Sequence, residues 1–98
     1  MKIKAFVKVP GEEGKMEHVN NTLERFQIIV LGYIETVTMP NGVVLICNEE
    51  GRLNGMDYNC DVMDVPFYGP ILIVGSKGDQ FSDVPLTITQ IRELITMR

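Results

Sequence analysis

Two adjacent glutamates, Glu49 and Glu50, stand between Asn48 and Gly51, directly after an apolar run that ends at Cys47. Paired carboxylates can serve as a general acid and a general base when their surroundings separate their pKa values. The same four residues also have the chemistry of a type I turn, which favours Asn at its first position and Gly at its last. Because nothing in the sequence buries the two glutamates, we expect a turn first and a functional site only second.

A second group of polar side chains, DYNCD at residues 57–61, has the spacing of the first three ligands of a calcium loop, D-x-N-x-D. Such a loop next requires a glycine and, at its twelfth position, a bidentate glutamate. This chain has Val62 and Tyr68 at those places. We therefore expect a solvated loop whose Asp and Asn side chains bond to nearby backbone.

A cysteine nucleophile would need a base within hydrogen-bond reach. Cys60 is the better placed of the two cysteines, but nothing in the sequence brings His18, the only histidine, to it. Cys47 is expected in the core. Two cysteines and one histidine cannot form a four-ligand zinc site, and GSKGD at 75–79 lacks the spacing of a phosphate-binding loop. The sequence assigns no catalytic residue, metal or cofactor.

The composition narrows the class of protein. The 98 residues fit a single domain spanning 1–98, and 45% hydrophobic residues can supply its core. A net charge of −4 argues against a nucleic-acid partner, which would need a basic surface. No run approaches the ~18 apolar residues of a membrane span, and the N-terminal residues do not resemble a secretion signal. We expect a cytoplasmic location, in a bacterial host, and no membrane partner.

Four segments have strand patterns. Residues 2–9 alternate, which predicts a strand with a solvated face that carries Lys2, Lys4 and Lys8. Phe6 interrupts this face, which leaves partial covering of it as the alternative. Residues 33–39 and 43–47 flank Asn41-Gly42, a strong hairpin signal, and the second of them is apolar on both faces and therefore central. Residues 71–75 predict another buried strand.

Two segments have helix patterns. Residues 20–31 predict a helix with Asn20 or Asn21 as N-cap and Gly32 as C-cap, although three consecutive β-branched residues leave a strand from Gln27 as the alternative. Residues 85–98 predict a helix in which Thr87 and Gln90 form a capping box. Its C-terminal end carries Arg98, where the helix dipole favours positive charge.

The remaining segments are expected to be loops. A short return strand is expected at Arg52-Leu53, an irregular segment at 56–70, and a surface loop at 76–83. The fold class that follows is α+β: a small mixed or antiparallel sheet of about four to five strands with two helices.

Four stretches carry a family resemblance: NTLERFQIIVLGYIETV, NGVVLICNEEGRLNG, YGPILIVG and DVPLTITQI. Together they resemble a family of unknown function, domain-of-unknown-function 3846, found in phages, mobile elements and Gram-positive bacteria. The most specific pieces are GYIE at 32–35, NEEG at 48–51 and Asn59. The resemblance covers nearly the whole chain. It implies a small α+β protein from a phage or integrated element, and no activity.

The first functional hypothesis is a non-enzymatic module that binds a host protein, with Glu49 and Glu50 either meeting a basic partner or bonding Tyr58 or Asn59. The alternative is a small-ligand binder, for a nucleotide-like molecule stacked on Tyr58, Phe67 and Tyr68, that acts as a homodimer. An enzyme using Glu49, Glu50 or Cys60 is the least favoured class. The candidate binding residues are Tyr33, Glu35, Asn48, Glu49, Glu50, Tyr58 and Asn59.

Overall fold

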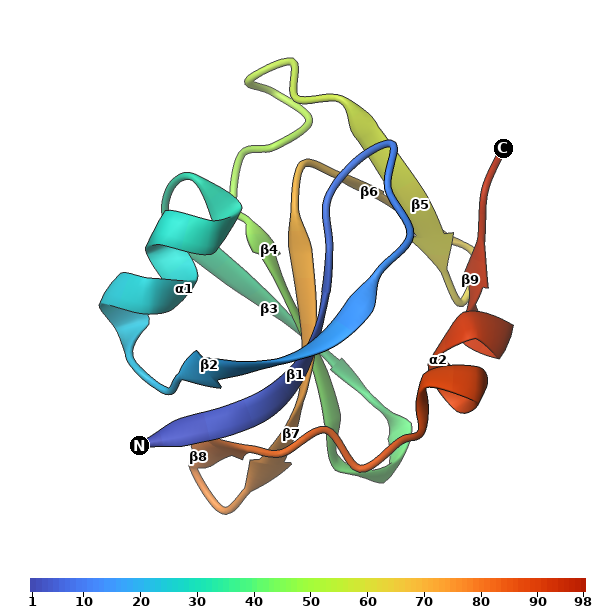
Figure 1. The fold of residues 1–98 in the computed structure, drawn as a ribbon. Helices are drawn as coiled ribbons and strands as arrows, with labels where there is room; N and C mark the ends of the chain where they lie inside the picture. The colour runs from blue at the N-terminus through green and yellow to red at the C-terminus, as the bar shows by residue number, and fades with distance from the viewer.

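The larger of two antiparallel sheets has six strands, in the order β2–β1–β7–β4–β3 with β8 paired to β7. The structure is a computed structural model that describes residues 1–98 (Figure 1). The strands of this sheet are β1 (Lys2–Lys8), β2 (Lys15–Asn20), β3 (Ile34–Met39), β4 (Val43–Asn48), β7 (Ile71–Lys77) and β8 (Gln80–Ser82).

The smaller sheet has three strands in the order β6–β5–β9. They are β5 (Tyr58–Val62), β6 (Val65–Tyr68) and β9 (Ile95–Thr96), and the helices are α1 (Leu23–Val30) and α2 (Ile88–Leu94). Every strand pairing in the two sheets is antiparallel. The α+β class with two helices is thus confirmed, whereas the expected four to five strands are too few.

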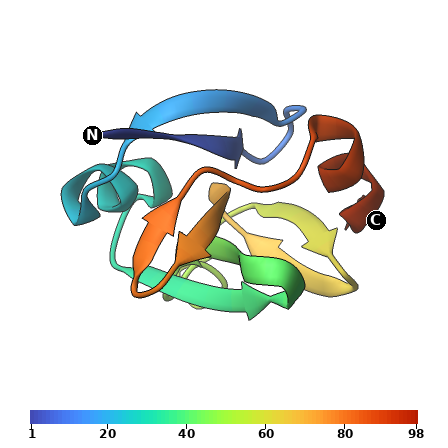
Figure 2. The same ribbon diagram turned by 90° about the horizontal axis from the view of Figure 1, so that it is seen from below.

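The larger sheet lies between two layers, as Figures 1 and 2 show. On one face α1 buries Phe26 and Val30 against the central strands β4 and β7. On the other face the smaller sheet and α2 cover a second cluster that includes Phe67 and Ile91. Both faces of β4 and β7 are therefore dry, which explains their continuous apolar sequences. The predicted hairpin between residues 33–39 and 43–47 is confirmed by β3 and β4.

Lys8 does not lie on a solvated face, and this prediction was wrong. It shares a face of β1 with Phe6, and it is only 4% exposed. The exposed Lys2 and Lys4 fit the expectation. The alternative indicated by Phe6, a partly covered face, holds for the end of the strand that carries Phe6 and Lys8.

The segment 56–70 is not irregular, because β5 and β6 form a hairpin there. Its turn uses Met63 and Asp64, which have φ values of +49° and +68°, so the glycine that usually signals such a turn is missing. The expected return strand at Arg52-Leu53 is instead part of a series of turns, and the expected loop at 76–83 contains the end of β7 and β8.

The predicted first helix is confirmed, with different caps. Thr22 is the N-cap, and its hydroxyl accepts from the Arg25 amide at 3.2 Å. Asn21 instead donates to the Phe81 carbonyl, which ties the helix to β8. The helix ends at Leu31, in the left-handed region at φ +66°, rather than at Gly32.

The capping box of the second helix is confirmed, because the Thr87 and Gln90 side chains bond to each other's backbone amides. The helix stops at Leu94 rather than at Arg98, since Ile95 and Thr96 pair with β5 as strand β9. β-branched residues suit this pairing better than another helical turn. Neither helix is long and apolar enough to span a membrane.

Candidate functional site

The predicted turn after β4 is confirmed, and Asn48 organises it. Its side chain is buried and bonds in two directions: Nδ2 donates to the Val30 carbonyl at 3.0 Å, and Oδ1 accepts from the Glu50 amide at 2.8 Å. The Gly51 amide closes the turn on the Asn48 carbonyl at 3.3 Å. One side chain therefore joins the end of α1 to the turn that carries the two glutamates.

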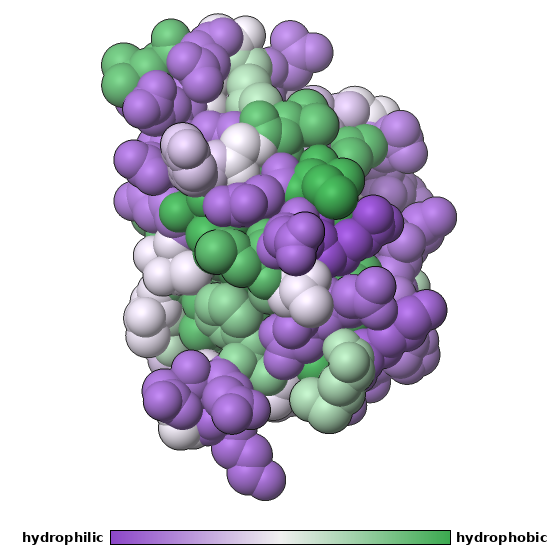
Figure 3. Space-filling model, turned by 90° about the vertical axis from the view of Figure 1, so that its left-hand side faces the viewer, coloured by the Kyte–Doolittle hydropathy of each residue, from purple (hydrophilic) through white to green (hydrophobic).

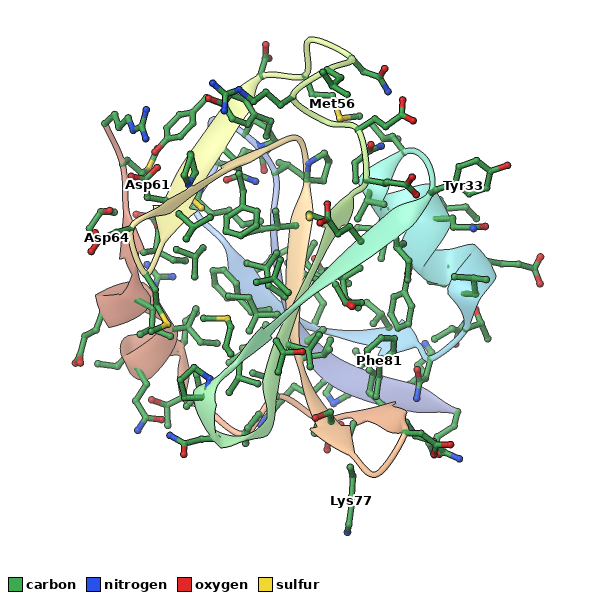
Figure 4. The ribbon with its side chains drawn as sticks, turned by 180° about the vertical axis from the view of Figure 1, so that it is seen from behind. Tyr33, Met56, Asp61, Asp64, Lys77 and Phe81 are labelled. Atoms are coloured by element: carbon green, nitrogen blue, oxygen red, sulfur yellow. The ribbon has the colours of Figure 1, made fainter.

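The backbone after α1 is held against the same turn. The Glu49 amide donates to the Tyr33 carbonyl at 2.9 Å. A Cβ atom at Gly32 would lie 2.7 Å from Asn48 Nδ2, so this approach requires glycine. The Tyr33 side chain itself is 75% exposed and points away from the body of the protein in Figure 4.

The loop that follows the turn is fixed against the end of β6. The Met56 amide donates to the Gly51 carbonyl at 3.0 Å, and the Gly69 amide donates to the Asp57 carbonyl at 2.8 Å. A Cβ atom at Gly51 would lie 2.6 Å from the Tyr68 carbonyl oxygen. Glu49 and Glu50 are thus presented by a backbone held from both sides.

A groove runs between β3 and β6. Its first part, about 260 Å³, is lined by Glu35, Glu49 and Tyr68 among others. A second hollow of about 240 Å³ shares Val37, Val65 and Phe67 with the first, and a third of about 200 Å³ shares Met39, Pro40 and Met63 with the second. The shared residues make the three hollows one groove with an acidic end and an apolar remainder.

Two strand edges without partners border this groove. β3 is the outermost strand of the larger sheet and pairs only with β4, and β6 is the outermost strand of the smaller sheet and pairs only with β5. Each outer edge carries backbone N–H and C=O groups that no other strand of the chain uses.

The carboxylates at and beside the acidic end form no ion pair. The structure contains two ion pairs, Glu13–Arg92 and Asp61–Arg98, so no Lys or Arg nitrogen lies within 4.0 Å of Glu35, Glu49 or Glu50. Arg52, which also lines this end, places its guanidinium over the Tyr68 ring, 5.6 Å from the ring centre. Glu35 and Glu49 line this end, Glu50 is the next residue of the turn, and none of the three forms an ion pair within the chain.

Both cysteines are buried, and their thiols are less acidic than usual. Burial, and to a smaller extent the charge of Glu35, raises the pKa of Cys47 to about 11. Burial likewise raises the pKa of Cys60, which is 0% exposed. His18 lies exposed on β2, the edge strand of the larger sheet opposite β3, whereas Cys47 is on β4 of that sheet and Cys60 is on β5 of the smaller sheet. No group of three His, Cys, Asp or Glu side chains is placed to hold a metal ion.

The structure brings together five of the seven candidate binding residues and separates the other two. Tyr33, Glu35, Asn48, Glu49 and Glu50 lie on or beside the turn and the groove. Asn59 is 0% exposed; its Nδ2 donates to the Lys8 and Gly69 carbonyls, both at 2.8 Å. The expectation that Glu49 or Glu50 bonds Asn59 or Tyr58 was wrong.

Tyr58 belongs to another cluster. Its hydroxyl donates to Asp61 at 2.8 Å, and the Arg98 guanidinium lies over its ring. Partial burial and then this hydrogen bond raise the pKa of Tyr58 above its ordinary value. In Figure 4, Asp61 and Tyr33 lie on opposite sides of the molecule.

The aromatic side chains proposed to stack a base are already in contact with other groups. The rings of Tyr58 and Tyr68 meet edge to face, with centres 5.8 Å apart. Phe67 is a core residue, 7% exposed. No observation of this cluster favours a stacked nucleotide.

Sequence reasoning missed the apolar part of the groove. Alternation in β3 places Glu35, Val37 and Met39 on one face, and this pattern could have indicated a half-covered surface. Val65 and Met63 could not be assigned to the same groove, because the hairpin that carries them was not predicted.

Comparison with known proteins gives one match. The model of the family described as Domain of unknown function (DUF3846) matches residues 1–96. The chain belongs to this family. No curated protein and no solved structure matches it. Membership in DUF3846 supports the resemblance carried by the GYIE and NEEG stretches, and it brings no activity with it.

Proposed function

We propose that this DUF3846 protein is a non-enzymatic binding module that engages another protein, in a host cell, through the groove between β3 and β6. The partner contributes an extended segment that carries Lys or Arg. The observation that carries the proposal is that Glu35 and Glu49 line the end of an apolar groove, with Glu50 next in the turn, and that none of the three is ion-paired.

Charge complementarity specifies the partner's chemistry. Three carboxylates without a cation within 4.0 Å attract a basic side chain and repel an acidic one. Pre-organisation strengthens this preference, because the hydrogen bonds of Asn48 and Tyr33 already fix the backbone of the turn. A partner that binds here does not have to order the loop, so less of the interaction energy is lost.

The strand edges support an extended conformation for that segment. An added strand satisfies unpaired backbone groups, while alternate side chains enter the groove and provide specificity. β3 offers six residues for such pairing and contains neither Pro nor Lys, the residues that commonly protect an edge. Apolar side chains of the partner would then contact Val37 and Val65.

A second exposed apolar surface is the rival location. Leu23, Ile28 and Leu31 project from or beside α1 and are more than half exposed. Figure 3 shows the side that carries α1, where apolar groups are broken up by polar ones. The groove, by contrast, combines a concave apolar wall with a charge patch, which favours it as the docking site.

A charge-reversal experiment tests the proposal. Tagged wild-type protein, the Glu49→Lys/Glu50→Lys variant and an Asp79→Lys/Glu93→Lys control variant are used to capture proteins from host lysate. Both variants reverse two exposed carboxylates that form no ion pair, and the control residues do not line the groove. We expect wild type and the control to retain the same protein, which binds through a basic extended segment, and the Glu49/Glu50 variant to lose it. Retention by the Glu49/Glu50 variant, or equal loss from both variants, would overturn the proposal.

Self-association through β3 is an alternative that the same protein samples can test. Sedimentation could show that the wild-type protein is a dimer and that the Glu49→Lys/Glu50→Lys variant is a dimer as well. If the wild-type protein also captures no partner from lysate, the occupant of the edge is a second copy of the chain. That result would replace the proposed partner.

A further inference from the structure

Lys8 is a buried cation that no carboxylate balances. It is the last residue of β1 and only 4% exposed. Its Nζ has two acceptors, Asn59 Oδ1 at 2.7 Å and the Asn59 carbonyl at 3.4 Å. Neither ion pair of the structure includes it. A charge withdrawn from water without a counter-charge is costly, so its presence needs an explanation.

The ammonium group also has hydrogen-bonding capacity to spare. An ammonium carries three donors, and both acceptors near Lys8 come from one neutral residue. Asn59 is 0% exposed, and its Nδ2 donates to the Lys8 and Gly69 carbonyls. These bonds hold the two Asn59 acceptors in place beside the ammonium group. One N–H donor of Lys8 therefore has no acceptor, and its ammonium group has no ion-pair partner, within the chain.

Lys8 lines a hollow of about 370 Å³ beside the β1–β2 loop. The other walls are Phe6, the loop residues 11–14, Arg92 of α2, and the apolar side chains of Ile95 and Met97. Figure 2 shows the β1–β2 loop next to α2, at the end of the molecule away from α1. The hollow is large enough for a small organic ligand.

The charges around this hollow favour a single negative charge on the ligand. Arg92 is already occupied: Nη2 donates to the Gly14 carbonyl at 3.3 Å, and Nη1 lies 3.7 Å from Glu13. Glu12 and Glu13 lie at the rim, and neither comes within 4.0 Å of Lys8. The ammonium group of Lys8 inside the hollow attracts one negative charge, whereas the two carboxylates at the rim repel a ligand with several negative charges, such as a polyphosphate.

We propose that this hollow binds a monocarboxylate with an apolar body. The carboxylate accepts the free N–H of Lys8, and the hydrocarbon part lies against Phe6, Ile95 and Met97. This site shares no lining residue with the groove between β3 and β6.

Titration of the ¹⁵N-labelled protein with sodium octanoate tests the site, with 1-octanol as the uncharged probe of equal chain length. We expect octanoate to shift the amide signals of Phe6 and Gly14 and not those of Glu49 and Glu50. Because a hydrogen bond to a charged group is involved, octanol should bind about 10- to 100-fold more weakly.

Two variants and one control complete the experiment. Lys8→Met should lower octanoate affinity about 10- to 100-fold and leave octanol affinity unchanged. Lys4→Met removes the same charge from an exposed position of the same strand and should change neither. Should Lys8→Met fail to fold, Met97→Glu, at an exposed wall position, should weaken octanoate selectively.

Three results would overturn the proposal: no shift at Gly14 up to millimolar octanoate, equal affinity for octanoate and octanol, or octanoate affinity equal to wild type in Lys8→Met or Met97→Glu. None of these results depends on the protein partner, so the proposal for this site and the proposal for the groove can be refuted independently.

Discussion

Replacing Asn48 with alanine is expected to destabilise the protein by about 1.5–4.5 kcal/mol. The larger part comes from the Val30 carbonyl, which accepts from Asn48 Nδ2 at 3.0 Å in a buried position. It is one of the last carbonyls of α1, which have no partner within the helix, and leaving it unsatisfied costs about 1–3 kcal/mol. The lost bond to the Glu50 amide adds about 0.5–1.5 kcal/mol, since water can reach that turn.

Urea denaturation followed by circular dichroism measures this loss, and Asn54→Ala is the matched control. Asn54 lies in the same loop, is exposed and has no side-chain hydrogen bond, so its replacement should change stability by less than about 0.5 kcal/mol. Hydrogen exchange at the Glu50 amide should become faster in Asn48→Ala but not in Asn48→Asp, which keeps the accepting oxygen. If Asn48→Ala and Asn54→Ala were equally stable, the role given to Asn48 would be refuted.

Three further changes follow from backbone strain and from buried thiols. Leu31→Gly should raise stability by about 0.5–1 kcal/mol, because Leu31 is exposed and has a φ of +66°; a lower urea midpoint would contradict this. Asp64→Gly, at φ +68° in the β5–β6 turn, should raise the midpoint similarly, and a loss of stability would show that the Asp64 side chain is needed. Burial holds the pKa of Cys47 in the folded protein at about 11, so the thiol of the unfolded chain ionises first, and the free energy of unfolding should fall as the pH rises from about 9 through 11. Cys47→Ala should make this fall smaller. An equal fall in the variant would show that other groups cause it.

The central part of the fold follows from sequence. The apolar runs 43–47 and 71–75 have no polar face, and a strand of that kind is stable only when both of its faces are covered. The capping box at Thr87 and the turn at Asn48 are equally local, since each depends on side chains bonding to backbone within three residues. Such signals do not depend on the rest of the molecule.

The parts that sequence did not predict depend on distant contacts. The β5–β6 hairpin contains Pro66 and turns at two non-glycine residues, so its strands form because the larger sheet offers them an apolar surface. Lys8 is buried because Asn59, 51 positions away, accepts from it. The groove needs β3 and β6 side by side, and no spacing along the chain encodes that arrangement.

The most direct test of the account is a photo-crosslinking comparison between the two exposed apolar surfaces. A benzophenone amino acid is placed at Val65, in the groove, or at Ile28, on the outer face of α1; the two side chains are 49% and 62% exposed. After irradiation in host lysate, crosslinked products are identified by mass spectrometry. We predict that Val65 crosslinks a protein through a basic extended segment and that Ile28 does not. A crosslink from Ile28 alone would contradict the assignment of the groove as the binding site.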